Sequence, residues 1–144
     1  MEIQVKVLHP DATIPSYANE GDAGCDLVAV ESCVLQAGGG RAMVPTGFAV
    51  AIPEGHGGFV LPRSGLAAKH GVTCINAPGL IDAGYRGEVM IALVNLDPTT
   101  DYEVRKGDRI AQLVVLPVSS AHFRTVEELP PARRGAAGFG SSGR

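Results

Sequence analysis

Residues 88–116 read EVMIALVNLDPTTDYEVRKGDRIAQLVVL, and this stretch decides the fold class of the chain. It contains three short aliphatic and β-branched runs, at Glu88–Leu96, Tyr102–Arg105 and Arg109–Leu116. Asp97-Pro98 ends the first run, and Lys106-Gly107-Asp108 predicts a hairpin between the second and the third. Short strands separated by turn residues in this way are typical of an all-β protein, a sandwich or a jelly roll.

The same rhythm of strands and turns extends through the rest of the chain, where 19 glycines and 10 prolines separate further apolar runs. The other predicted strands are Ile3–Leu8, Cys25–Val30, Ala42–Ile52, Gly58–Leu61, Val72–Asn76 and His122–Thr125. Pro45 interrupts one of them, which predicts an edge strand or a bulge. One short helix is predicted, with Ser64 as its N-cap and Gly71 at its C-terminal end.

Length and composition indicate one water-soluble domain. A chain of 144 residues can bury a core of its own, and no apolar run is long enough to span a membrane. The first residues read as a strand, so we expect no signal peptide and a cytoplasmic location. Three scattered cysteines and four scattered histidines favour neither a disulfide framework nor a zinc site. The formal net charge of -3 argues against a nucleic-acid partner.

Two of the strand runs predict an oligomer. Val89–Leu96 and Ile110–Leu116 are apolar nearly throughout, whereas a strand with one solvent-exposed face alternates apolar and polar residues. A small sandwich covers only one face of each strand by itself. A symmetric homo-oligomer is therefore predicted to cover the other face.

The segment NAPGLIDAGYRGE, residues 76–88, is the strongest candidate for chemistry. Its three glycines allow the backbone to bend sharply, in a predicted hairpin, and to approach a flat ligand closely. Asp82 is a lone carboxylate among apolar and glycine neighbours, which favours a general base over a solvated surface charge. A turn-capping aspartate is the alternative. Tyr85 could pack in the sheet or form a platform beneath a sugar ring.

Three further segments carry groups that could hold an anion or a metal ion. Arg63-Ser64-Gly65 lies where a strand meets the helix, and a guanidinium beside free helix amides can bind an anion, although Ser64 could be only a cap. Asp26 either caps a loop or binds magnesium through water. Gln112 lies on an apolar strand, and its amide needs a partner there, either a phosphate oxygen or a backbone group.

The C-terminal residues 131–144 are predicted to form a flexible arm that closes over a ligand, following a β domain of residues 1–130. Pro130 and Pro131 would form a stiff hinge. Arg134 would supply a forked cation and Phe139 a flat face for a base, with backbone donors from Gly140, Ser141 and Ser142. A disordered Gly/Ser tail is the alternative.

Five segments together resemble, in order and approximate spacing, the five motifs of the trimeric dUTPases. They are AGCDL, PRSGLA, GLIDAGYRGEV, DRIAQLVV and RGAAGFGSSG, and they span residues 23–143. The resemblance implies a jelly-roll or β-sandwich subunit and a homotrimer with three sites at subunit interfaces. It also implies magnesium-assisted hydrolysis of dUTP to dUMP and pyrophosphate, which limits uracil in DNA and supplies dUMP for dTMP synthesis. Ala137 and Cys25 depart from the usual pattern without removing a functional group.

The resemblance also assigns roles to single residues. Asp82 would activate the water that attacks the α-phosphorus, and Tyr85 would pack against the deoxyribose and exclude a 2′-hydroxyl. Asp26 would orient the hydrated magnesium ion. The residues implied to recognise uracil are Asn76, Leu80, Ile81 and Met90. The residues implied to hold phosphates or to close the site are Arg63, Ser64, Gly65, Gln112, Arg134, Phe139, Gly140, Ser141 and Ser142.

Two alternative functions remain open at this point. The dCTP deaminases share the implied fold, but they use a glutamate in the strand after the hairpin, and this chain has Ala92 at the matching place. A non-catalytic trimer would bind dUTP without releasing pyrophosphate.

Overall fold

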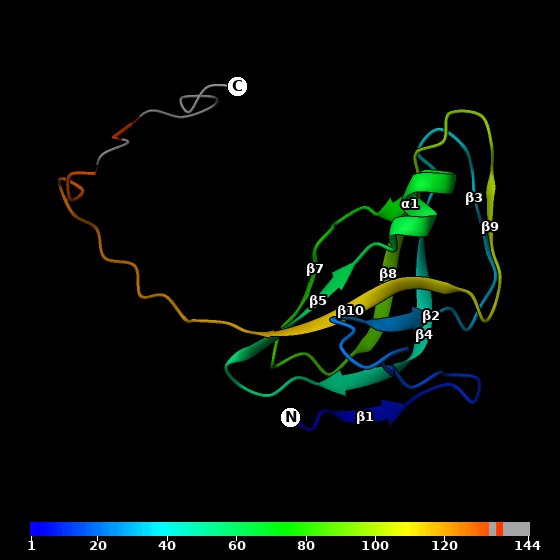
Figure 1. Cartoon of the computed structure of the whole chain (residues 1–144), viewed down its shortest axis with the longest axis horizontal. Helices are drawn as coiled ribbons and strands as arrows, with labels where there is room; N and C mark the ends of the chain where they lie inside the picture. The colour runs from blue at the N-terminus through cyan, green and yellow to red at the C-terminus, as the bar shows by residue number, and fades with distance from the viewer. Residues whose placement is uncertain (133–134, 137–144) are drawn as a thin grey trace.

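The structure is a computed structural model that describes residues 1–132 and 135–136. Within these residues it is mostly β, with one short helix, which confirms the predicted all-β class at this level (Figure 1). The elements are β1 (Gln4–Val7), β2 (Cys25–Val28), β3 (Cys33–Leu35), β4 (Arg41–Ala51), β5 (His56–Leu61), α1 (Ser64–His70), β6 (Val72–Cys74), β7 (Gly79–Ile81), β8 (Glu88–Asn95), β9 (Tyr102–Val104) and β10 (Arg109–Pro117).

The described strands form three antiparallel sheets. One has the order β1-β4-β8-β6, the second β2-β10-β5-β7, and the third is the pair β3-β9. A single hydrophobic core joins all three, and Phe48, Leu27, Leu35, Ile91 and Ile110 are among its fully buried side chains. Burying each such side chain contributes roughly 1.5–3 kcal/mol, so this core is the main source of stability.

The bulge predicted at Pro45 is present in β4. The β4–β8 register shifts between Pro45 and Ala49, and Gly47 takes a φ of 76°, which a residue with a side chain rarely adopts. The N–H of Gly47 donates to the Glu88 carboxylate at 2.8 Å, and the Thr46 hydroxyl donates to the Val89 carbonyl at 2.6 Å. β1 pairs only with Phe48–Ala51 of β4, so Pro45 lies at the bulge where β8 is the only strand beside β4 in the described chain.

The predicted hairpin at residues 106–108 is wrong. β9 pairs with β3, whereas β10 pairs with β2 and β5, so the turn passes from one sheet to another. The local turn forms as expected, with the Asp108 N–H on the Arg105 carbonyl at 2.9 Å. The Gly107 N–H donates to the Ala29 carbonyl at 2.8 Å and the Asp108 carbonyl accepts the Ala29 N–H at 2.9 Å, directly after β2, and this contact directs β10 away from β9.

The segment 76–88 is likewise not a simple hairpin. β6 ends at Cys74 and joins the β4–β8 sheet, while β7, which was not predicted, pairs with β5 in the other sheet. The chain then returns to the first sheet as β8. Residues 75–87 therefore cross between the two sheets twice, and this crossing builds the pocket described below.

The predicted strand His122–Thr125 is wrong as well. Residues 118–132 contain no strand and are exposed throughout, and they extend away from the sheets beyond β10 (Figure 1). The N–H of Val118 donates to the Gly55 carbonyl at 2.8 Å at the start of this segment. A short apolar run forms a strand only where another strand offers its edge, and none lies beside these residues in the described chain.

The N-cap of helix α1 lies one residue earlier than the sequence predicted. Arg63 is the N-cap, without a side-chain hydrogen bond, and Ser64 is the first helical residue, so the assignment of Ser64 as N-cap is wrong. Gly71 ends the helix in the left-handed conformation, as predicted, with φ 65°. No helix within residues 1–132 has both the length and the apolar character needed to cross a bilayer.

The cysteine of β6 should be chemically inert in the folded protein. Burial raises the pKa of the Cys74 thiol to about 11, so the reactive thiolate is scarce near pH 8. Cys25 and Cys33 are only half-buried. Thiol titration with Ellman's reagent should detect Cys74 only after guanidinium unfolding, and rapid modification of Cys74 in the native protein would contradict this assignment.

Candidate active site

A pocket of about 260 Å³ opens between β7 and its turn on one side and β8 on the other. Its apolar lining includes Met43, Leu80, Ile81, Met90 and Ala92. Its polar side chains are Asn76, Asp82, Tyr85 and Glu88. A mostly apolar pocket with a few convergent polar groups is the usual form of a small-molecule site.

The predicted uracil-binding residues come together in this pocket. Along β7 the side chains alternate, so Leu80 is exposed at the pocket while Ile81 is buried toward the core. A Cβ at Gly79 would lie 3.2 Å from the Asn76 amide nitrogen, so the glycine allows Asn76 to pack closely against the strand. β7 is also the edge of its sheet, and the backbone groups on its outer side have no strand partner among the described residues.

Asp82 follows β7 directly and begins the turn that carries Tyr85. The Tyr85 N–H donates to the Asp82 carbonyl at 3.0 Å. The Arg86 guanidinium donates to the carbonyls of Ala83 and Tyr85 at 2.6 and 2.7 Å, which braces the turn. The Asp82 side chain is exposed in the single chain. The expectation that its apolar and glycine neighbours keep it from solvent is therefore wrong, because they are too small to cover it.

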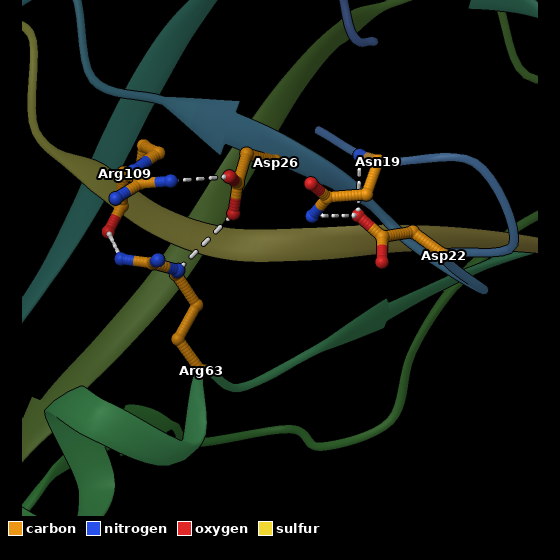
Figure 2. A network of polar contacts seen from close by, with 5 residues as sticks. All are labelled: Asn19, Asp22, Asp26, Arg63 and Arg109. Carbon is orange, nitrogen blue, oxygen red and sulfur yellow. Dashed lines mark hydrogen bonds and ion pairs between the residues drawn. The ribbon is translucent and has the colours of Figure 1, made fainter. Parts of the chain in front are cut away.

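A second cluster of predicted site residues lies around Asp26 (Figure 2). One oxygen of this carboxylate is 3.1 Å from Nε of Arg63, and the other is 3.1 Å from a terminal nitrogen of Arg109. Arg63 also donates to the Arg109 carbonyl at 3.0 Å. One carboxylate between two guanidiniums leaves a net positive charge, which suits a polyphosphate.

Gln112 belongs to this second cluster. It is paired in register with Asp26 on β2 and with Leu61 on β5. Its amide nitrogen donates to the Pro62 carbonyl at 3.0 Å, so its partner in the single chain is a backbone group. Ser64 and Gly65 lie next to it at the exposed start of α1, and a Cβ at Gly65 would meet no atom within 4 Å.

The catalytic candidate Asp82 and the guanidinium of Arg63 lie beside opposite ends of β5. Ile81 pairs with Gly58, which places Asp82 beside the start of β5, whereas Arg63 follows the end of that strand. Six residues of β-strand span about 20 Å. The phosphates of one nucleotide lie within a few bond lengths of one another, so one triphosphate cannot reach both clusters of the same chain. Arg134, Phe139, Gly140, Ser141 and Ser142 lie outside the described residues.

The described residues offer no set of three or more His, Cys, Asp or Glu side chains that could hold a metal ion. Asp26 alone, already paired with two arginines, does not form a direct metal site. It fits an outer-sphere role, in which a magnesium ion arrives with the triphosphate and keeps its water ligands.

Sequence reasoning missed three residues that the structure places at these sites. Arg109 shares the Asp26 carboxylate with Arg63. Glu88 lines the pocket, and Gly87 lies directly beneath the Tyr85 ring. The signal was available for all three, because each lies within a segment that matched a motif, but only the contacts reveal what the side chains touch.

Comparison with known proteins establishes the family. The sequence model of the dUTPase family matches residues 10–143. The chain belongs to the dUTPase family. A deoxyuridine 5′-triphosphate nucleotidohydrolase of Thermobifida fusca is 53% identical over 143 residues, which is 99% of this chain and 79% of that protein. The predicted resemblance to dUTPases is thereby confirmed.

Solved dUTPase structures share the fold. The dUTPase of Staphylococcus bacteriophage 80alpha, solved with dUPNHPP, superposes with a TM-score of 0.90 at 33% identity, covering 99% of both chains. A mutant dUTPase from phage phi11 of S. aureus, described with a structural Mg(II) ion, gives a TM-score of 0.82 at 29% identity, covering 91% of this chain and all of that one.

Proposed function

We propose that this dUTPase hydrolyses dUTP to dUMP and pyrophosphate by attack of an Asp82-activated water on the α-phosphorus. Its class as a dUTP-hydrolysing enzyme follows from the family and agrees with the prediction from sequence. One observation carries the mechanism. An apolar slot, the free edge of β7 and the exposed Asp82 carboxylate lie together in one pocket.

The pocket suits a uracil ring and its sugar. Leu80 and Met90 offer apolar surfaces to a flat base, while the outer edge of β7 and the Asn76 amide offer donors and acceptors to its polar rim. Tyr85 lies beyond the base, where its ring would pack against the deoxyribose. In this proposal the groups around the base exclude a 5-methyl group, and Tyr85 excludes a 2′-hydroxyl.

In this proposal Asp82 lies where the sugar of the bound nucleotide leads on to its phosphates. An ionised carboxylate accepts the proton of a water molecule as that water attacks phosphorus, and it also fixes the direction of attack. Arg63, Ser64, Gly65 and Gln112 would hold the phosphate oxygens. The positive charge of Arg63 offsets the negative charge that the leaving pyrophosphate carries, and the other three residues supply uncharged hydrogen-bonding groups.

A homotrimer with jelly-roll subunits completes the site in this proposal. Asp82 and Arg63 are about 20 Å apart along the sheet, so the phosphate cluster must come from another copy of the chain. The apolar surface of β10 supports such an assembly, because Val114 and Val115 are only half-buried and Leu116 is exposed. Closed symmetric rings are the common result of repeated contacts between identical chains.

Magnesium is the proposed cofactor. Asp26 would hold the hydrated ion, which when bound neutralises phosphate charge and orders the triphosphate. The guanidiniums of Arg63 and Arg109 keep the Asp26 carboxylate in place for this role. Removal of magnesium by EDTA should weaken dUTP turnover, and full turnover in excess EDTA would contradict this part of the proposal.

The division into a β domain of residues 1–130 and a closing arm of residues 131–144 is also proposed. Residues 118–132 support this division, because they form no strand, are exposed, and extend away from the body of the protein (Figure 1). Deletion of the residues after Arg133 should lower kcat on the order of 10²-fold, because an incompletely enclosed substrate is poorly positioned. Sedimentation should show an unchanged oligomer. A truncated protein with unchanged kcat would remove the arm from the mechanism.

Release of pyrophosphate from dUTP, dCTP, dTTP and UTP tests the function as a whole. We expect release from dUTP alone. Ammonia release from dCTP would support the deaminase alternative, although the pocket has Ala92 where those enzymes use a glutamate. Tight dUTP binding without pyrophosphate would support a non-catalytic trimer. A cytoplasmic location, and the lack of nucleic-acid and membrane partners, stay predictions that cell fractionation and binding assays can test.

A further inference from the structure

The ring of Tyr85 lies folded back over its own turn. Its hydroxyl donates to the Glu88 carbonyl at 2.9 Å. The ring covers Gly87, where a Cβ would overlap the phenol oxygen and would lie only 2.7 Å from Cζ and 3.1 Å from Cε2. Real Cβ atoms essentially never approach other atoms this closely, so the ring and a side chain at position 87 cannot both occupy this space.

The backbone at Gly87 does not itself require glycine. The glycines with positive φ in the described chain include Gly47, Gly55 and Gly71 but not Gly87. An alanine could therefore adopt the same backbone conformation. Beyond its two chain neighbours, the three atoms nearest to such a methyl group all belong to the Tyr85 side chain. The lack of a side chain at position 87 thus serves the placement of the tyrosine.

The carbonyl that holds Tyr85 is itself anchored. The carboxylate of Glu88 accepts the N–H of Gly47 at 2.8 Å, in the bulge of β4. Glu88 is also paired with Ala49 in the sheet. The Tyr85 ring is thus tied to the rigid body of the protein through its hydroxyl, as well as through the turn that Arg86 braces.

We propose that Gly87 is a specificity-determining residue that acts through Tyr85 against ribonucleoside triphosphates. Having no side chain, it lets the ring lie against the turn with its hydroxyl on Glu88, as a fixed wall beside the 2′ position of the sugar. A Tyr85 ring fixed in this position rejects a 2′-hydroxyl by steric overlap, whereas a displaced ring leaves space for it. The inference depends on the proposed function, in which Tyr85 packs against the deoxyribose.

Gly87→Ala tests this inference, and Gly84→Ala is its matched control. Both glycines lie in one turn, but a Cβ at Gly84 would meet no atom within 4 Å. Steady-state kinetics of pyrophosphate release give kcat/KM for dUTP and for UTP. In Gly87→Ala we expect the dUTP to UTP ratio to fall about tenfold or more, the size of effect that one substrate group has in a pocket. Gly84→Ala should keep the wild-type ratio.

A double-mutant cycle separates the ring from other effects of the new methyl group. Tyr85→Ala should lose the discrimination by itself, and adding Gly87→Ala to it should change the ratio no further. Two results would overturn the inference: a wild-type ratio in Gly87→Ala, or an additional loss in the Tyr85→Ala background. A wild-type ratio in Tyr85→Ala itself would instead overturn the proposed role of Tyr85, and the inference with it.

The cycle also covers the case in which Gly87→Ala does not fold. Circular dichroism would then be measured on the double variant, where the obstructing ring is absent. Recovery of the fold supports the inference, because it shows that the methyl group conflicts only with Tyr85. Failure of the double variant to fold, where Tyr85→Ala folds, would show that glycine is needed for another reason and would overturn it.

Discussion

Asp82→Asn should lower kcat for dUTP by about 10²–10⁴-fold, the usual contribution of a general base. The amide keeps the shape of the side chain but cannot take up the proton of the attacking water. Substrate affinity should be retained or increased, because a negative charge beside the phosphates has been removed. Pyrophosphate release measures kcat, and calorimetric titration with dUTP and magnesium measures affinity.

Glu31→Gln is the matched control for this substitution. It makes the same chemical change at an exposed position outside the pocket, in the loop between β2 and β3. We expect wild-type kcat and affinity from it. Wild-type turnover in Asp82→Asn would show that the exposed carboxylate is not the base, and the proposed mechanism would have to be abandoned.

Mixing two inactive variants should restore activity, which is the second large effect expected. Asp82→Asn lacks the base, and Arg63→Ala lacks a phosphate-binding guanidinium. If each site takes Asp82 from one chain and Arg63 from another, random mixing of equal amounts leaves about a quarter of the sites with both residues intact. If both residues serve the same site of one chain, no site is intact.

The two variants carry different affinity tags and are refolded together. Oligomers that contain both variants are then isolated by purification on each tag in turn. Each variant refolded alone is the control, and so is a mixture made after refolding, in which the chains have not exchanged. Activity that appears only in the co-refolded sample supports the shared site. Co-refolded trimers with the residual activity of the single variants would show that one chain supplies both residues.

Much of the strand pattern could be predicted from the sequence. β4, β8 and β10 lie within one residue of their predicted ends, because long runs of β-branched and aliphatic residues bounded by turn signals have few other ways to be buried. β3 and β7 were missed. Each has only three residues and forms by pairing with a strand distant in the sequence, β3 with β9 and β7 with β5. Strand pairing was not predictable at 106–108, since it depends on a contact with the distant Ala29.

The candidate site shows the same division. The turn that carries Asp82 and Tyr85 is local, so its residues could be chosen from thirteen consecutive letters, and the structure brings them into one pocket. Ser64 was misassigned because a serine before an apolar run resembles an N-cap, whereas the end of β5 places Arg63 in that position. The exposure of Asp82 could not be predicted, since it depends on how little of its side chain the surrounding turn covers.

By itself the sequence determined the β class, the irregular pairing at Pro45 and the family, because these follow from local periodicity, proline stereochemistry and ordered motifs. Only the tertiary structure decided that Asp82 and Arg63 lie beside opposite ends of β5, and that Tyr85 occupies the space above Gly87. Both facts depend on strand register and on side-chain overlap. These are set by long-range packing, which no short segment of sequence contains.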